Sequence, residues 1–576
     1  MLRKLLTYLA KYKIYAILCP LAVIGEVFLE IRIPFLMSKI VDEGIAHRDI
    51  DYVLQTGGLM VLMALFSLLF GVLSSRFAAT ASMGLGSELR KALFYKVQDF
   101  SFSNIDKFST ASLVTRLTTD VSHAQGAFMM TIRILVRAPI MLISATFMAY
   151  SINQTLVDVF LVAIPVLGLA LALIAMTALP RFGVMLKKYD AINASVQENL
   201  IAIRVVKAFV RSQYEKLKFK RANDDLMQAS IRAEKIVVCN LPFMQLTMYA
   251  CIIAILWFGG HMVVVGSMLT GQLIGFISYV TQIMISLMLI SMVFVHLVLS
   301  RASVSRIFEV IDEQVDITDG LGSSERRVAD GSIVFEDVSF RYNPKSEIDT
   351  LQHINISIKA GQTVGIIGGT GSAKTTLVQL IPRLYDATAG RVIVGGCAVQ
   401  DYKLQELRSA VAMVLQKNML FSGTIKDNLL WGNTEATDEQ IIAACKVAQA
   451  HDFIMSFPDG YATILGQGGV NVSGGQKQRL CIARALLKKP KILILDDSTS
   501  AVDTATEARI REGIRAYSKD ITVIIIAQRI TSVCDAEQII VLDEGKVNAI
   551  GTHSELLQNN KIYQEVYCSQ QKGVSQ

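Results

Sequence analysis

The sequence lacks paired cysteines and lacks a cleavage site near its start. Its eight cysteines are scattered over 576 residues without a CxxC pair, so neither a zinc site nor a disulfide framework is predicted. The basic start, 1–6, leads into a long apolar run interrupted by Glu26, Glu30 and Arg32, and no small-residue cleavage site ends this run. We therefore expect a retained first membrane span rather than a removed signal peptide.

Charge is sparse in this chain and nearly balanced in sign. Only 18% of the residues are charged, and 56 basic residues against 49 acidic ones leave a net charge of +7. Basic loops beside a membrane account for this excess, so no nucleic-acid partner is predicted. Hydrophobic residues make up 52% of the sequence and the mean hydropathy is +0.44, which excludes an ordinary soluble protein of this size. The lipid bilayer is therefore an expected partner.

Long apolar segments fill the first half of the chain, and a bilayer span takes about 20 such residues. Two long loops between them, 84–127 and 180–236, are rich in Lys and Arg, whereas the loops on the other side are short. The positive-inside rule places these loops, both termini and the second half of the chain in the cytoplasm of a cell-membrane protein. The six predicted spans are 14–38, 57–80, 128–151, 155–179, 237–265 and 272–299.

The two basic loops contain no break strong enough to end a helix. We therefore expect the spans to continue as helices into the cytosol, turn and return. The turns near 108–111 and 207–212 are predicted to contact the soluble half of the chain. The alternative is that each is a solvated basic loop near anionic lipid.

Two carboxylates inside the first predicted span have two possible roles. Glu26 and Glu30 share one helix face, and charges within a span are costly enough to need a cavity or a partner. They either act in transport, by lining a substrate path that favours cations or by carrying protons, or form a structural pair with Arg32, Arg133 or Arg137.

A methionine stripe in the sixth predicted span also has two interpretations. Met284, Met288 and Met292 follow an i, i+4, i+8 spacing. Methionine surfaces adapt to varied apolar ligands, but ordinary helix packing produces the same spacing.

A glycine-rich loop stands between a strand pattern, 363–367, and a predicted helix. Strand, glycine loop and helix are the context in which backbone N–H groups bind phosphates. Lys374 is expected to reach the β and γ oxygens, and the Thr375 hydroxyl to bind Mg²⁺. Ala373 stands where this pattern asks for glycine, and its methyl group is tolerable if φ is negative there. The predicted ATP site comprises Gly368, Gly369, Thr370, Gly371, Ser372, Ala373, Lys374, Thr375 and Thr376.

Acidic and amide side chains complete the predicted site. Asp496 ends an apolar strand pattern and suits a Mg²⁺-linked position, while Asp497 is placed to orient the attacking water. Gln416 is expected to sense the γ-phosphate or the metal, and Gln528 to donate a hydrogen bond to the γ-phosphate without the charge that a histidine can carry. Tyr342, just after an opening strand, is a candidate to stack on adenine.

These motifs, in this order, resemble the half-transporters of the ATP-binding cassette (ABC) exporter family. The resemblance implies a membrane α-helical domain of six transmembrane helices with long cytosolic extensions, fused to an α/β P-loop nucleotide-binding domain. The expected boundaries are 1–310 for the transmembrane domain, 311–330 for a linker and 331–576 for the nucleotide-binding domain. The matching motifs are the phosphate loop 368–375, the Q-loop Gln416, the signature 472–476, the Walker B strand 492–496, the D-loop 500–503 and the A-loop Tyr342.

Two departures from the family pattern imply an asymmetric assembly. Family members usually carry Glu and His where this chain has Asp497 and Gln528. Asp is one methylene shorter than Glu, so its carboxylate falls roughly 1.5 Å short, and a misplacement of about 1 Å can cost about 10²-fold in rate. The combination of an intact signature with these two altered residues resembles the degenerate-site subunit of bacterial heterodimeric multidrug exporters. The intact signature, Ser473, Gly474, Gly475 and Gln476, with Asp503, would then act on ATP bound by a second, different half-transporter.

The resemblance therefore implies an ATP-driven exporter of hydrophobic or amphipathic small molecules that uses ATP and Mg²⁺. ATP hydrolysis is expected mainly at the site shared with the partner. A lipid or peptide exporter of the same fold, an ATP-gated channel or regulatory subunit, and a slowly hydrolysing homodimer remain alternatives.

Overall fold

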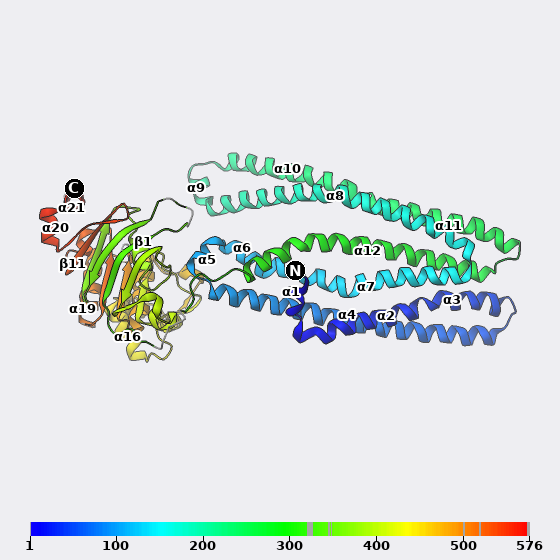
Figure 1. The fold of residues 1–576 in the computed structure, drawn as a ribbon, viewed down its shortest axis with the longest axis horizontal. Helices are drawn as coiled ribbons and strands as arrows, with labels where there is room; N and C mark the ends of the chain where they lie inside the picture. Colours follow the sequence, from blue (N-terminus) through cyan, green and yellow to red (C-terminus); the bar gives the residue numbers. More distant parts are fainter. Residues whose placement is uncertain are drawn as a thin grey trace. The chain divides into compact units, whose positions relative to one another are not determined.

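Long helices form the first half of the chain, and mixed sheets with short helices form the second (Figure 1). The computed structural model describes residues 2–319, 326–343, 346, 348–498, 502–517 and 520–572. The chain divides into two units, Met1–Gln98 with Ser109–Glu313, and Asp99–Phe108 with Gln314–Gln576. The segment 99–108, from the first basic loop, therefore belongs to the second unit. Residues 320–325 of the expected linker lie outside the described residues.

The first unit contains helices that are long and apolar enough to cross a membrane. Among the described residues there are six such stretches, so the predicted number of spans is confirmed. Helix α4 (Ile50–Asp99) has 50 residues and is about 75 Å long, more than twice the roughly 30 Å hydrocarbon core. The expected helical extensions are therefore confirmed. The six stretches are Ala10–Ile45, Ile50–Asp99, Thr110–Ile152, Gln154–Ile201, Ser212–Val264 and Thr270–Ile311.

Serine caps explain where the first basic loop turns. Ser101 caps helix α5 through a capping box with Asn104, and Ser109 caps helix α6, so the chain breaks between 99 and 110. The other helices of this half are α1 (Leu2–Thr7), α2 (Lys13–Glu30), α3 (Arg32–Lys39), α7 (Val121–Ile152), α8 (Gln154–Ile201), α9 (Ile203–Ala208), α10 (Ser212–Val238), α11 (Asn240–Val264) and α12 (Thr270–Ile311); α5 is Phe102–Lys107 and α6 is Thr110–Thr115.

Helices α7 and α12 pack along each other, and α8 packs against α10 and α11 (Figure 1). In the core of this unit the rings of Phe160 and Phe276 stack with centroids 5.2 Å apart. The buried Tyr279 hydroxyl donates to the carbonyl oxygen of Ile31 at 2.9 Å, which ties α12 to the junction of α2 and α3. Met284 is buried in this core, whereas Met288 and Met292 are about two-fifths exposed, so the methionine stripe is only partly packed.

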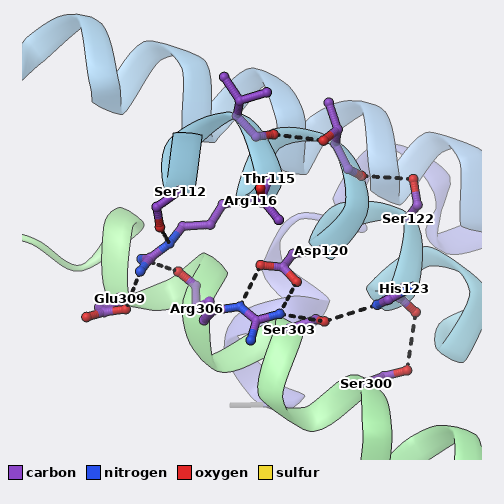
Figure 2. A network of polar contacts seen from close by, with 12 residues as sticks. Ser112, Thr115, Arg116, Asp120, Ser122, His123, Ser300, Ser303, Arg306 and Glu309 are labelled. Carbon is purple, nitrogen blue, oxygen red and sulfur yellow. Dashed lines mark hydrogen bonds and ion pairs between the residues drawn. The ribbon is translucent and has the colours of Figure 1, made fainter. Parts of the chain in front are cut away.

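A polar cluster joins the start of α7 to the end of α12 (Figure 2). Asp120, fully buried at the end of the π-helical turn η3 (Arg116–Asp120), accepts hydrogen bonds from Nε and Nη2 of Arg306. Arg116 donates to the carbonyl oxygen of Arg306 at 2.9 Å and pairs with Glu309 at 2.8 Å. We call Arg116, Asp120, His123, Ser303, Arg306 and Glu309 the α7–α12 polar cluster.

The second unit is built on a central six-stranded sheet of order β12-β11-β3-β10-β9-β6, in which all neighbours except β11 and β12 run parallel. A second, antiparallel sheet has the order β2-β1-β4-β5. Buried aliphatic side chains fill the parallel strands of the central sheet, which is typical of a parallel sheet covered on both faces. The strands are β1 (Ile333–Phe340), β2 (Leu351–Ile358), β3 (Thr363–Gly368), β4 (Ala389–Val394), β5 (Cys397–Ala398), β6 (Val411–Val414), β7 (Gly423–Thr424), β8 (Ile464–Leu465), β9 (Ile492–Asp496), β10 (Thr522–Ile526), β11 (Gln538–Asp543) and β12 (Lys546–Gly551).

Short helices connect these strands and close the unit at its C-terminal end. They are α13 (Lys374–Gln379), α14 (Leu404–Ala410), α15 (Ile425–Leu430), α16 (Asp438–Val447), α17 (His451–Met455), α18 (Gly474–Leu487), α19 (Thr504–Tyr517), α20 (His553–Asn559) and α21 (Lys561–Lys572).

Candidate functional site

Four neighbouring parallel strands bring the predicted site residues to one edge of the central sheet. The glycine loop follows β3, Gln416 follows β6, Asp497 follows β9 and Gln528 follows β10. The carboxyl ends of parallel strands meet at the same edge, where open α/β sheets bind their ligands. The described residues enclose a cavity of about 510 Å³ at this edge, lined by Thr350, Ile367, Gly368, Gly369, Thr370, Gly371, Ser372, Ala373, Lys374, Thr375, Thr376, Gln416, Asp496, Asp497, Ile526, Gln528 and Val566.

The glycine loop is folded around its own lysine. Lys374 Nζ donates to the carbonyl oxygens of Gly368 at 2.9 Å and Gly369 at 2.7 Å. Burial lowers the pKa of Lys374, because the charged ammonium is partly withdrawn from water. Gly371 has φ = +86°, a conformation that favours glycine. A cation beside a cavity edged with glycine backbone fits a phosphate-bearing ligand.

The φ angle of Ala373 differs from the negative value at which its methyl group would be tolerated. A negative φ would have made its methyl group harmless, but φ is +67° and ψ is 24°, in the left-handed region. For a residue with a Cβ this conformation costs roughly 1–2 kcal/mol. Ala373 directly precedes helix α13 and occupies its N-cap position, where residues are usually in the β region. The substitution of glycine by alanine is therefore a strained one.

A hydroxyl and a buried carboxylate meet beside the loop. Thr375 Oγ1 donates to Asp496, at 3.1 Å from Oδ1 and 2.9 Å from Oδ2. Burial is the main reason that the pKa of Asp496 is raised; the charge of Asp497 adds to it, while the Thr375 bond opposes it. Hard oxygen ligands of this kind suit Mg²⁺, which binds through one or two protein oxygens and takes its other ligands from water and phosphate. The pair fits that ion.

Asp497 lies between two amide side chains. Its Oδ2 accepts from Gln528 Nε2 at 3.0 Å and lies 3.4 Å from Gln416 Nε2. Its backbone N–H donates to the carbonyl oxygen of Ile526 at 3.0 Å, and its φ of +47° is in the left-handed region. The structure thus brings together the three residues that the sequence predicted as catalytic.

Tyr342 stands beside the glycine loop on a cluster of aromatic rings. Its hydroxyl lies 3.0 Å from Thr376 Oγ1, and its ring packs edge-on against Tyr385 with centroids 5.2 Å apart. About half of Tyr342 is exposed, so part of this side chain is accessible to a ligand. Burial of the hydroxyl end raises the pKa of Tyr342.

Tyr385 also connects this cluster to the segment from the first basic loop. Its hydroxyl donates to Asp106 Oδ2 at 2.7 Å, and its ring packs edge-on against Phe102 at 6.0 Å. Phe102 and Asp106 belong to α5, immediately before the turn predicted to contact the soluble half. The second predicted turn, 207–212, exposes Phe209 and Val210.

The signature residues lie away from this cavity. Ser473 caps helix α18, and its side chain accepts from the N–H of Gln476 at 3.3 Å. Ser473 and Gly474 are exposed, so a ligand held by another chain can reach this helix end. Asp503 accepts from the N–H of Thr506 at 2.9 Å, which lowers the pKa of Asp503. Ser500 and Ala501 of the predicted D-loop lie outside the described residues.

Sequence reasoning missed the part of the site formed by the C-terminal helix. Val566 of α21 lines the cavity, and Gln570 on the same helix bonds to the backbone of Gln528 and Ile530. No motif marks either residue, because the packing of α21 on this edge is a long-range contact.

Within the first unit, both acidic residues of the first span bond to one arginine. Arg137 contacts Glu26 at 3.1 Å and Glu30 at 2.6 Å. Ser74 Oγ also lies 3.4 Å from the buried Glu26. The structural pairing considered for these residues is therefore present, with Arg137 as the partner.

Comparisons with known proteins agree with this architecture. A family model described as the ABC transporter transmembrane region matches residues 16–287, and one described as ABC transporter matches residues 351–500. A solved structure of a bacterial Atm1-family ABC exporter with ATP bound has a TM-score of 0.82 and 24% identity, covering 98% of each chain. At this identity the likeness shows the fold alone.

Several curated relatives align over most of their length. The chain is 39% identical over 569 residues to the uncharacterized ABC transporter ATP-binding protein YfiB of Bacillus subtilis (strain 168), covering 99% of this chain and 98% of that protein. It is 31% identical to the ATP-dependent lipid A-core flippase of Syntrophus aciditrophicus (strain SB), covering 84% and 80%. It is 30% identical to the putative multidrug export ATP-binding/permease protein YgaD of B. subtilis (strain 168), covering 99% of both. The chain therefore belongs to the ABC transporter family, as an exporter half-transporter in which a membrane domain is fused to a domain that binds and hydrolyses ATP.

Proposed function

We propose that this chain is one subunit of a heterodimeric exporter that moves hydrophobic or amphipathic compounds out of the cell by alternating access. Its own phosphate loop forms a site of low hydrolytic activity, and its signature helix α18 completes the active site of a second, different half-transporter. The observation that carries this proposal is the contact between Asp497 and Gln528 at the edge of the cavity.

The chemistry of these two residues explains the low activity. Asp497 is one methylene shorter than glutamate, and its carboxylate accepts from neutral amides. Neither Gln416 nor Gln528 can become positively charged to stabilise the developing charge of phosphoryl transfer. ATP can therefore be held at this site while the attacking water is poorly oriented.

The other residues around the cavity are proposed to bind the nucleotide. ATP supplies the phosphoanhydride bond whose cleavage drives transport, and Mg²⁺ neutralises charge on its phosphates. The backbone of 368–373 and Lys374 would hold the phosphates, and the ring of Tyr342 would stack on adenine. Thr375, Asp496 and Gln416 would hold the ion, and Thr376 would orient Tyr342 through their 3.0 Å contact.

The signature is proposed to work on the partner's nucleotide. Ser473, Gly474, Gly475 and Gln476 form the N-terminal end of α18, of which Ser473 and Gly474 are exposed, and the dipole of this 14-residue helix favours an anion there. Asp503 would lie with the signature at the interface between this chain and the partner subunit. Both departures from the family pattern, Asp497 and Gln528, lie at the chain's own ATP site, whereas the signature residues keep the family pattern. This distribution supports an asymmetric pair.

The substrate class is proposed from the character of the first unit. Its spans carry many exposed apolar side chains, and Met288 and Met292 are partly exposed on the core-forming helix α12. The name of the relative YgaD supports multidrug export, whereas that of the lipid A-core flippase favours a lipid as the second candidate. The basic loops support an orientation with both termini and the nucleotide-binding domain in the cytoplasm.

The first test is the composition of the complex in its native membrane. The tagged chain is isolated and the intact mass of the complex is measured. A 1:1 complex with a different half-transporter is expected, and a mass of twice this chain would overturn the asymmetric proposal. ATP-dependent uphill uptake into inverted vesicles is expected for an exporter, whereas ion conductance without uptake would favour a channel.

A further inference from the structure

The C-terminal helix α21 forms part of the wall of the nucleotide cavity. Val566 lines this cavity, and Gln570 lies four residues later on the same helix face. The amphipathic packing of α21 is continuous with the core of the unit, since Ile562, Val566 and Tyr567 all pack against it. The helix thus touches the site at a place that no motif marks.

The carboxamide of Gln570 makes two hydrogen bonds to the segment that carries Gln528. Its Nε2 donates to the carbonyl oxygen of Gln528 at 2.8 Å, and its Oε1 accepts from the N–H of Ile530 at 2.9 Å. One planar amide therefore fixes the backbone on both sides of Arg529. Arg511 of α19 holds the next residue, donating to the carbonyl oxygen of Thr531 at 2.7 Å.

Helix α21 is itself firmly anchored, so it can serve as a fixed support. Tyr563 is fully buried, and its hydroxyl contacts His553 Nδ1 at 2.6 Å. Gln564 donates to the carbonyl oxygens of Leu557 at 2.7 Å and Gln558 at 3.1 Å, which ties α21 to α20. The support for the Gln528 segment therefore comes from the end of the chain.

We propose that Gln570 is a positioning residue for Gln528. By holding the carbonyl of Gln528 and the N–H of Ile530, it fixes the direction in which the Gln528 side chain leaves the backbone toward Asp497. The inference rests on the proposed ATP site and deepens it: the C-terminal helix sets how long this site retains ATP. Loss of the two hydrogen bonds frees the segment without removing any group from the cavity.

The experiment measures release of Mg²⁺·ATP from the full-length chain in lipid nanodiscs. Gln570→Met keeps the size of the side chain and removes both hydrogen bonds. We expect ATP release about three- to tenfold faster than from the wild type, in line with two backbone hydrogen bonds. Gln564→Met is the matched control, because it removes two hydrogen bonds between α21 and α20 while Tyr563 still anchors α21 and both Gln570 bonds to the Gln528 segment remain.

A double-mutant cycle separates positioning from general damage. If Gln570 acts through Gln528, Q570M should change the release rate less than about twofold in a Q528A background. Gln570→Asn, which withdraws the amide by one methylene, is a second variant and should behave like Q570M. Equal release from the wild type and Q570M, an equal effect of Q564M, or an undiminished effect in the Q528A background would each overturn the role of Gln570.

A separate control distinguishes failure of the proposed site. Lys374→Ala should greatly weaken ATP binding if the cavity is the nucleotide site. Unchanged binding in that variant would overturn the site and this inference with it. Normal dependence on Lys374 with no effect of Q570M would overturn the inference alone.

Discussion

Gln528 donates a hydrogen bond from Nε2 to Oδ2 of Asp497 across 3.0 Å, at the point where the adjacent strands β9 and β10 end. The chain approaches the same oxygen from a third strand, with Gln416 Nε2 at 3.4 Å. Both side-chain amides that contact this carboxylate are neutral donors, so these contacts hold it in place without the positive charge that a histidine at position 528 could carry. The catalytic consequences of this contact can be tested directly.

Replacing Asp497 by alanine is expected to change ATP turnover of the native complex by less than about threefold, because the productive site is proposed to lie with the partner. The pair Asp497→Glu with Gln528→His should instead raise hydrolysis by the isolated chain, by about 10- to 100-fold, since a displacement of about 1 Å can cost about 10²-fold in rate. Phosphate release is measured in both cases, with Lys374→Ala as the inactive control for the isolated chain. Near-complete loss of turnover with Asp497→Ala would contradict the degenerate site.

Replacing Ala373 by glycine is expected to stabilise the phosphate loop. The left-handed conformation costs alanine roughly 1–2 kcal/mol. Glycine avoids this strain but makes the unfolded chain more flexible, which lowers stability by about 0.4–1 kcal/mol. The net gain should be about 0.5–1 kcal/mol in the free energy of unfolding of this unit, measured by denaturant in the full-length chain. Ala373→Val is the opposite control, because a β-branched residue at φ = +67° is more strained. A lower stability of Ala373→Gly would contradict the strain.

The sequence predicted the local parts of the site well. Gly368 to Thr376 are consecutive, and a strand before them fixes their conformation; Gln416, Asp497 and Gln528 each follow an apolar strand pattern, so their convergence follows from a parallel sheet. The sign of φ at Ala373 could not be predicted from the sequence, because the path of the whole glycine loop determines it. Val566 and Gln570 could not be found either, since their position depends on how α21 packs in three dimensions.

Removing the Tyr385 hydroxyl tests whether α5 communicates with the nucleotide site. Tyr385→Phe keeps the packing with Tyr342 and Phe102 but loses the 2.7 Å hydrogen bond to Asp106. A hydrogen bond to a carboxylate contributes about 1.5–3 kcal/mol. We expect basal ATP hydrolysis of the complex to persist while ATP-driven uptake into inverted vesicles falls several-fold. An equal fall in hydrolysis and uptake would show damage to the nucleotide site rather than lost coupling.

The α7–α12 polar cluster is expected to hold two helices of the first unit together. Asp120 is fully buried while the Arg306 side chain is about half exposed, so Asp120→Asn should cost about 1–3 kcal/mol in stability. Arg306→Gln should act on the same interaction, and the double variant should be less destabilised than the sum of the two. Thermal unfolding of the four proteins in nanodiscs measures this coupling. Additive losses would mean that the two residues act separately.

Removing the charges of Glu26, Glu30 and Arg137 distinguishes a transport role of the two carboxylates from a structural one. Arg137 contacts both carboxylates, so Arg137→Gln leaves two acids near each other without a cation. The cost should be about 3 kcal/mol, the lower end for a broken buried pair, because Glu26 is buried while Glu30 is about a third exposed. The triple variant Glu26→Gln, Glu30→Gln, Arg137→Gln carries no charge at this place and should fold and transport substrate at near wild-type rates. Uptake of a cationic compound and of a neutral compound into inverted vesicles is measured for the wild type and for the triple variant. If the triple variant folds but loses uptake of the cation alone, the carboxylates contact substrate, and their pairing with Arg137 is only one of their roles.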